Sequence, residues 1–196
     1  MKQTSYNVAS EFEDIYQKIS SNKILNITDR SELPIYIQPY PIQFEEEVNE
    51  QILLLESRLS KLNKALHINL YDLVLEILRA DGILSEIIDY ESEIDKRNLL
   101  ETLCQFITNE RIMQKIGYLV KESHPNIIIL SGIAALFPYV RAHNILNNMP
   151  EELYTVSTLL FYPGYYNNES LILFGENGIN EDNYYRAHNL STLKIK

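Results

Sequence analysis

In Asn126-Ile127-Ile128-Ile129-Leu130, four aliphatic residues follow one polar residue without interruption. A strand with one face in water alternates apolar and polar residues. A strand of a parallel sheet is covered by helices on both faces and is apolar throughout. The segment therefore predicts an inner strand of a parallel sheet.

Other segments along the chain have the composition of strands. They are Leu33–Gln38, Ala65–Leu70, Thr155–Tyr162 and Ser170–Phe174. Pro39 and Pro41 are expected to end the first of them, because proline cannot donate to a sheet ladder. Helical segments separate most of the strands, as the crossover connections of parallel strands require. We therefore predict an α/β fold with a mainly parallel sheet of about five strands and helices on both faces.

Apolar spacing of three and four residues predicts the helices. The clearest are Phe12–Ile19, Phe44–Asn63 and Leu73–Ala80. Asp72 is the expected N-cap of the last, and Gly82 is expected to close it. Residues 83–123 are predicted to form a helical insertion in three pieces between the second and third strands. Pro138 is expected to open a further helix. No linker rich in Gly, Ser or Pro divides the chain, so residues 1–196 are predicted to form a single α/β domain.

Composition and charge limit the compartment and the partners. The 196 residues are 45% hydrophobic, and the lone cysteine, Cys104, excludes an internal disulfide framework. Cys104 is expected to be a buried thiol, because it lies in an amphipathic helix beside Leu103 and Phe106. The formal net charge of −10 repels a phosphate backbone, so nonspecific DNA binding is not expected. Without an apolar run long enough for a bilayer or a signal peptide, we predict a cytoplasmic protein with no membrane partner.

The motifs of common nucleotide-binding and hydrolytic sites do not occur in the sequence. Pro39-Tyr40-Pro41 follows the first strand, and proline has no N–H with which a phosphate loop could wrap an anion. There is no Rossmann fingerprint, no G-x-S-x-G elbow and no H-E-x-x-H. Ser131-Gly132 follows the third strand but lacks the Gly-x that precedes the serine of an elbow. We therefore expect no catalytic residue, no bound metal and no cofactor.

Two heptads are nearly the same, YVRAHNI at Tyr139–Ile145 and YYRAHNL at Tyr184–Leu190. The match is either a coincidence or a structural or functional pairing. Arg141 and Arg186 are expected near the carboxyl edge of the sheet, each held by hydrogen bonds or an acid. There they would either clamp a phosphate or carboxylate, or form internal salt bridges. The accompanying histidines, His143 and His188, are expected to be structural rather than metal ligands.

Tyr, Pro and Gly are frequent where the predicted strands end, and ligands of open α/β sheets bind at the carboxyl ends of strands. Simple turn chemistry would give the same composition. The cluster Tyr162, Tyr165, Tyr166, Tyr184 and Tyr185 is the best candidate for a protein interface. Its alternative is ordinary half-buried packing. Together with the first heptad, these observations give the predicted binding residues: Arg141, His143, Asn144, Tyr162, Tyr184, Tyr185 and Arg186.

Four segments resemble the BrxB family, in order and spacing, and the resemblance covers the chain from about Phe12 to Leu190. The segments are INLYDLVLEIL at Ile68–Leu78, FPYVRAHNIL at Phe137–Leu146, LFYPG at Leu160–Gly164 with SLILFG at Ser170–Gly175, and DNYYRAHNL at Asp182–Leu190. The one departure is His188, where some members have an aromatic residue. The family belongs to BREX systems, which protect bacteria against phage and mark host DNA by methylation. The resemblance implies a small component that works beside a methyltransferase and large ATPases and associates directly with PglZ, an alkaline-phosphatase-like protein.

Composition agrees with a role in protein association, since the chain is acidic, has 14 tyrosines and lacks nucleotide-binding motifs. The first hypothesis is a noncatalytic interaction component of a BREX phage-defence complex. The alternative is an enzyme, or a degenerate nucleotide- or phosphate-binding protein, that uses the strand-end crevice with Arg141, His143 and Arg186. An open crevice lined by convergent polar groups would favour the alternative. A crevice filled by Tyr and Pro would favour the first.

Overall fold

The structure is a computed structural model that describes residues 6–21, 34–61, 64–175, 178–183 and 187–193. Its helices are α1 (Val8–Ser20), α2 (Glu45–Leu59), α3 (Leu70–Ala80), α4 (Ile83–Tyr90), α5 (Lys96–Phe106), α6 (Asn109–Ser123) and α7 (Ala142–Asn147). Its strands are β1 (Ile35–Tyr40), β2 (Ala65–Asn69), β3 (Ile127–Ser131), β4 (Ser157–Tyr166), β5 (Ser170–Leu173), β6 (Ile179–Asn183) and β7 (His188–Asn189).

Five strands run parallel in the order β2-β3-β4-β1-β7, which confirms the predicted mainly parallel sheet. The carboxyl end of β4 continues past the main sheet and pairs antiparallel with β5, which pairs antiparallel with β6. The expected fifth strand, Ser170–Phe174, is therefore not part of the parallel order. That place belongs to β7, which is only two residues long and carries too short a pattern to be predicted.

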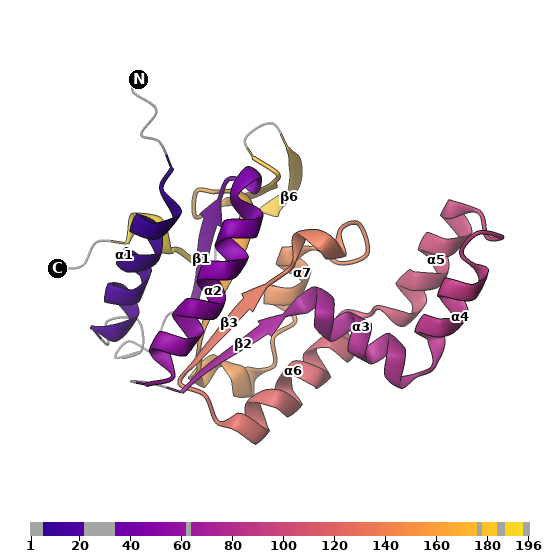
Figure 1. Ribbon diagram of the computed structural model, residues 1–196, viewed down its shortest axis with the longest axis horizontal. Helices are drawn as coiled ribbons and strands as arrows, with labels where there is room; N and C mark the ends of the chain where they lie inside the picture. Colours follow the sequence, from indigo (N-terminus) through magenta and orange to yellow (C-terminus); the bar gives the residue numbers. More distant parts are fainter. Residues whose placement is uncertain (1–5, 22–33, 62–63, 176–177, 184–186, 194–196) are drawn as a thin grey trace.

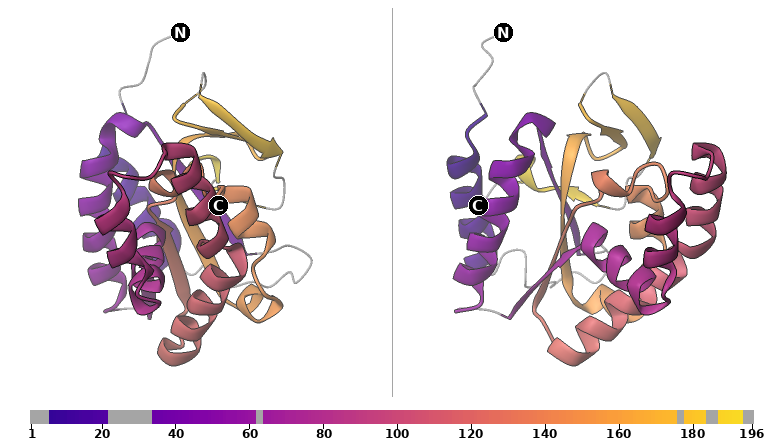
Figure 2. Two further views of the ribbon diagram at one scale, coloured as in Figure 1. Left: turned by 90° about the vertical axis from the view of Figure 1, so that its right-hand side faces the viewer. Right: turned by 45° about the vertical axis from the view of Figure 1, so that its right-hand side comes forward.

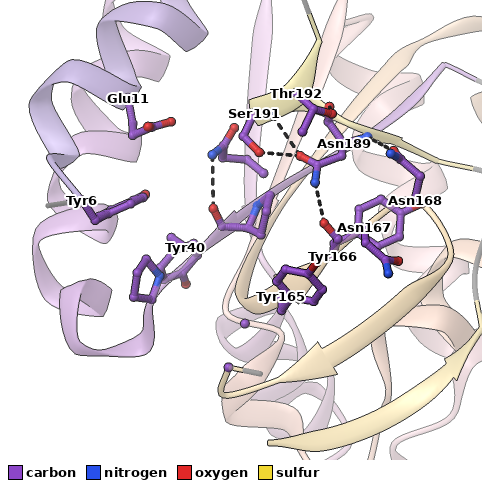
Figure 3. Close-up of a pocket in the computed structure, with 15 residues that line it drawn as sticks. Tyr6, Glu11, Tyr40, Tyr165, Tyr166, Asn167, Asn168, Asn189, Ser191 and Thr192 are labelled. Carbon is purple, nitrogen blue, oxygen red and sulfur yellow. Dashed lines mark hydrogen bonds between the residues drawn. The ribbon is translucent and has the colours of Figure 1, made fainter. Parts of the chain in front are cut away.

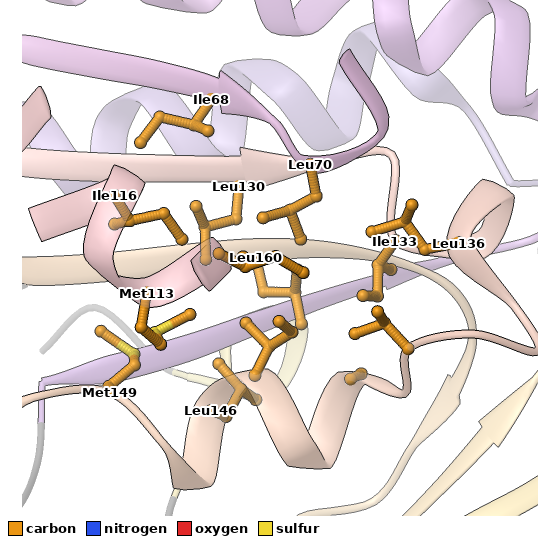
Figure 4. Packing of buried hydrophobic residues seen from close by; sticks show 14 of the residues in the cluster. Ile68, Leu70, Met113, Ile116, Leu130, Ile133, Leu136, Leu146, Met149 and Leu160 are labelled. Atoms are coloured by element: carbon orange, nitrogen blue, oxygen red, sulfur yellow. The ribbon is translucent and has the colours of Figure 1, made fainter. Parts of the chain in front are cut away.

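Helices cover both faces of the sheet, as Figures 1 and 2 show, and the apolar run in β3 explains why. Ile127 and Ile129 pack with α1 and α2, whereas Ile128 and Leu130 pack on the opposite face with α3, α6 and α7. Successive side chains of a strand point to opposite faces, so a strand covered twice must be apolar at every position. The second, larger layer is seen in Figure 4, where Met113 and Ile116 of α6 meet Leu130, Leu160 and Leu146.

The insertion between β2 and β3 consists of three helices, α4, α5 and α6, as predicted. Helix α6 packs on the sheet through buried apolar residues. Helices α4 and α5 bury none of their residues, and they extend away from the sheet in Figure 1. We call α4 and α5 the arm.

Local details differ from the sequence predictions at four places. Strand β1 runs through Pro39, because β7 pairs only with Tyr36 and Ile37 and no described strand faces Pro39 on that side. Asn69, not Asp72, is the N-cap of α3, since its Oδ1 accepts the N–H groups of Tyr71 (3.0 Å) and Asp72 (3.3 Å).

The other two differences concern the second half of the chain. Helix α7 begins at Ala142 rather than Pro138, because the chain turns through residues 137–139 and Arg141, the N-cap residue, is extended (φ −113°, ψ 147°). Cys104 is exposed, so the expectation of a buried thiol is wrong. Leu103 and Phe106 of α5 are half-buried against the core, whereas Cys104 between them in sequence faces solvent.

Candidate functional site

A crevice of about 650 Å³ opens at the carboxyl ends of β1 and β4. Its walls are Gln38–Pro41 from β1, Gly164–Asn168 from β4 and the turn beyond, Asn189 with the 3-10 turn after β7, and Tyr6 and Glu11 from the start of α1. Figure 3 shows Tyr6 and Glu11 on one side and Tyr165 and Asn168 on the other. The crevice therefore lies at the edge where ligands of parallel sheets usually bind.

Asn189 organises the far wall of the crevice. It is 5% exposed, its Nδ2 donates to the carbonyl of Tyr166, and its Oδ1 accepts from Ser191 N (3.0 Å) and Ser191 Oγ (2.6 Å). Its own backbone N–H donates to Asn168 Oδ1 (2.7 Å). A single side chain thus joins β4, β7 and the turn that follows, so this wall is held in one geometry.

Gln38 is different, because its side chain is buried but incompletely satisfied. The residue is 1% exposed and its Nε2 donates to Pro39 O at 3.2 Å. Among the residues that the structure describes, its Oε1 has no hydrogen-bond partner. A buried acceptor of this kind costs about 1–3 kcal/mol, so its presence in the wall of a crevice requires an explanation.

The electrostatics of the crevice favour groups that donate hydrogen bonds. Burial raises the pKa of Glu11, and neighbouring Asp14 raises this pKa further. Lys18 acts in the opposite direction and lowers it in part. Burial and the Glu11 carboxylate raise the pKa of Tyr6. No lysine, arginine or histidine is among the described residues that line the crevice. A phosphate or carboxylate would therefore contact no basic side chain of the described lining.

Two further tyrosines in the wall are neutral at any ordinary pH. Tyr40 Oη donates to Glu45 Oε2 at 2.6 Å, and burial, together with that carboxylate, raises the pKa of Tyr40. Tyr166 Oη donates to Ala187 O at 2.7 Å, and burial raises the pKa of Tyr166 to about 12. Their rings are therefore available as uncharged walls rather than as acids or bases.

The predicted binding residues that the structure describes, Arg141, His143, Asn144 and Tyr162, do not line the crevice. Arg141 precedes α7, which contacts β6, and its carbonyl accepts from Asn144 N and Ile145 N. None of the ion pairs between described residues includes Arg141, so the expected acid clamp is not seen. His143 and Asn144 lie half-buried in the first turn of α7.

The tyrosine cluster separates into different environments. Tyr162 is wholly buried in the core, so its predicted place in an interface is wrong, and Tyr166 is also buried. Tyr165 is 38% exposed and lines the crevice. Tyr184, Tyr185 and Arg186 lie outside the described residues.

The two heptads fold differently. In the first copy, Ala142–Asn144 begins a helix, whereas in the second, His188 and Asn189 form a strand. Asn189 holds the crevice wall, but its counterpart Asn144 does not line the crevice. The repeated words are therefore not copies of one structural unit, at least over the part of each that the structure describes.

Sequence reasoning missed Gln38, Asn189 and Glu11. A polar residue at the end of an otherwise apolar strand was the available signal for Gln38. Glu11 comes from the first helix and Asn189 from a two-residue strand, so only the tertiary fold brings them together.

A second polar cluster lies at the β2 edge, beneath α2. His67 Nε2 is 2.8 Å from Ser131 Oγ, its backbone N–H donates to Glu56 Oε1 at 3.0 Å, and its Nδ1 is 4.0 Å from Glu56 Oε2. Serine, histidine and carboxylate are the components of a nucleophilic triad. Ser131 is only 1% exposed, however, and does not line the adjacent cavity. The cluster therefore joins β2, β3 and α2 rather than presenting a nucleophile to substrate.

The described residues contain no group of three or more His, Cys, Asp or Glu side chains arranged to hold a metal ion. Within the same part of the chain, no helix is both long and apolar enough to cross a membrane.

Comparison with known proteins places the chain in a family. The family model described as "BREX protein BrxB" matches residues 66–190. A BREX protein BrxB of Bacillus cereus (strain H3081.97) is 36% identical over 168 residues, covering 82% of this chain and 84% of that protein. One from Escherichia coli O9:H4 (strain HS) is 26% identical over 177 residues, covering 90% and 88%. No solved structure matches. Because the model spans more than half of the chain and the first relative is similar over most of its length, this chain belongs to the BrxB family of BREX proteins.

Proposed function

We propose that the chain is a noncatalytic interaction component of a BREX phage-defence complex in the cytoplasm, and that it binds a PglZ-like protein of the alkaline-phosphatase superfamily. Family membership supports the role in BREX. The projecting arm is the observation that supports a role in binding, because it extends from the sheet and exposes Ile88 and Tyr90, two large apolar side chains.

The arm exposes apolar side chains beside acids. Ile88 and Tyr90 of α4 are 64% and 56% exposed, and no residue of α4 or α5 is buried. Exposed acids of the arm and its connecting turn are Glu86, Asp89, Glu91, Glu93 and Asp95. Large exposed apolar side chains with a charged rim are typical of association surfaces. The acids select a partner whose contacting surface is apolar and basic.

The test is copurification of the full chain with its PglZ-like partner, both expressed from the same BREX locus. Ile88→Asp should lower the affinity at least about tenfold, because a charge replaces an exposed apolar side chain of α4. Leu54→Asp is the matched control, since Leu54 is 55% exposed but lies on α2, away from the arm. Both variants should fold, because both side chains are exposed in the wild type.

Each outcome has a separate meaning. If the wild-type chain does not form the complex, the proposed association is wrong. If the Ile88 and Leu54 variants bind equally well, the arm is not the contact surface. Because an acidic surface is involved, the affinity should also fall as ionic strength rises from about 50 to 500 mM.

The noncatalytic part of the proposal has its own experiment. The enzyme alternative requires Arg141, His143 and Arg186 at the strand-end crevice, and neither Arg141 nor His143 is among its described lining residues. We expect no ATP hydrolysis by the purified chain. Turnover that copurifies with the protein and disappears in Arg141→Ala would contradict this.

A further inference from the structure

We propose that the crevice at the ends of β1 and β4 receives the guanidinium of an arginine side chain of a protein partner. This inference rests on the proposed function as an interaction component and deepens it by naming the group that is bound. The crevice is distinct from the arm, so the two surfaces make separate contributions.

The first step is the acceptor that lacks a donor. Gln38 is 1% exposed and forms part of the crevice wall, and its Oε1 has no hydrogen-bond partner among the described residues. The orientation of the amide follows from the other end, because Nε2 donates to Pro39 O. A ligand that donates an N–H to Oε1 would give this oxygen its missing hydrogen bond. The crevice therefore favours a ligand with a hydrogen-bond donor.

The second step is that several donors of the same wall already form hydrogen bonds within the protein. Asn167 Oδ1 accepts from Glu169 N and Ser170 N, at 3.0 and 2.8 Å. Asn168 Oδ1 accepts from Asn189 N, and Asn189 Oδ1 accepts from Ser191. The backbone N–H groups of Glu169, Ser170, Asn189 and Ser191 are therefore satisfied within the protein, whereas the buried Gln38 acceptor is not.

The third step concerns charge and shape. With Glu11 in its wall and no basic residue in its described lining, the crevice favours a cation. Tyr6 and Tyr165 add aromatic faces on opposite sides (Figure 3), and such faces attract cations. A guanidinium fits better than an ammonium, because it is planar, stacks on rings and donates several N–H groups in one plane.

The same chemistry already occurs within the chain. The guanidinium of Arg58 lies 3.7 Å from the ring centroid of Tyr16 and donates to Glu13 Oε2 at 3.0 Å. Both partners are on α1, the helix that supplies Glu11 to the crevice. The crevice offers an equivalent acid and aromatic ring, together with the Gln38 acceptor, but its described lining contains no arginine.

The experiment is an NMR titration of the isotope-labelled full chain with three probes: N-acetylarginine amide, N-acetyllysine amide and the neutral isostere N-acetylcitrulline amide. We expect saturable shifts of the Gln38 side-chain amide with the arginine probe, weaker ones with lysine and none with citrulline. Equal binding of citrulline or lysine would overturn the assignment of a guanidinium, and no saturable shift at Gln38 with any probe would overturn the site.

Two variants and a control separate binding from folding. Gln38→Leu and Glu11→Gln should each lower the affinity for the arginine probe by about tenfold. Gln38→Leu should leave the melting temperature unchanged or raise it, because it removes a buried acceptor without a partner. Glu46→Gln on the exposed side of α2 changes the net charge by the same amount as Glu11→Gln and should leave binding unchanged.

Copurification then distinguishes this inference from the proposed function. If the wild-type chain binds the PglZ-like partner and Gln38→Leu binds equally well, the crevice does not hold that partner's arginine, although the association stands. If the wild-type chain binds no such partner but does bind the arginine probe, the crevice chemistry is correct and the proposed association is wrong.

Discussion

His67 shows how one side chain can connect three elements. It reaches Ser131 on β3 and Glu56 on α2 from its own position on β2. Burial is the main cause that lowers the pKa of His67, while Glu56 and Asp72 act in the opposite direction. The neutral imidazole is therefore the form that the folded protein favours.

This pKa shift predicts a loss of stability in mild acid. The unfolded chain takes up a proton at His67 near pH 6.5, whereas the folded chain does so only at lower pH. Stability should therefore be complete above about pH 6.5 and should fall as the pH drops from there through the lower pKa of the folded state. His67→Gln should flatten this part of a profile of melting temperature against pH. The exposed His124→Asn is the control for removing a histidine, and equal slopes in wild type and His67→Gln would disprove the account.

Replacing glycine by alanine should have opposite effects on stability at two positions. Gly117 lies in α6, and a Cβ there would meet nothing within 4 Å. Gly117→Ala should stabilise the protein by about 0.5–1 kcal/mol through helix propensity. Gly132 has a φ of +74°, and its Cβ would lie 2.2 Å from Asn69 Oδ1, the cap of α3. Gly132→Ala should cost about 1–3 kcal/mol, and urea denaturation of both variants checks the signs.

Among the elements, β7 depends on its asparagine more than its two-residue length suggests. Asn189→Ala should destabilise the protein by about 1–3 kcal/mol, because buried partners in Tyr166 and Ser191 lose their hydrogen bonds. Asn144→Ala is a control supplied by the repeated heptad, and it should change stability by no more than about 0.5 kcal/mol. Thermal unfolding of the two variants measures both changes in stability. Equal losses would mean that the asparagines serve equivalent roles despite their different elements.

The elements themselves were largely predictable, for reasons that particular residues make clear. Ile127–Leu130 determined the parallel sheet, and the spacing within residues 83–123 gave three helices. The position of Ser170–Leu173 was not predictable, because an apolar strand looks the same whether its neighbour is parallel or antiparallel. Most of the crevice was also beyond the sequence, since Glu11, Gln38 and Asn189 meet only after β1 takes its place between β4 and β7.

On the scale of the whole molecule, charge makes a simple prediction about nucleic acid. The net charge of −10 opposes association with a phosphate backbone. The purified chain at about 10 µM should not retard a random DNA duplex in a gel shift at about 100 mM salt, in contrast to typical nonspecific binders. Retardation that weakens steeply with added salt would reveal a basic surface and contradict the prediction.

The position of β1 inside the sheet affects how the chain can fold while it is being synthesised. Its neighbours begin at Ser157 and His188, and Lys18 of α1 donates from Nζ to Leu190 O at 2.8 Å. A ribosome that adds about 5–20 residues per second needs roughly 6–23 seconds to pass from the end of β1 to the start of β4. During that time Ile35 and Ile37, both fully buried in the finished protein, have no sheet to join. The nascent chain is therefore most prone to aggregate through its earliest strand, and products truncated before Ser157 have no route to this fold.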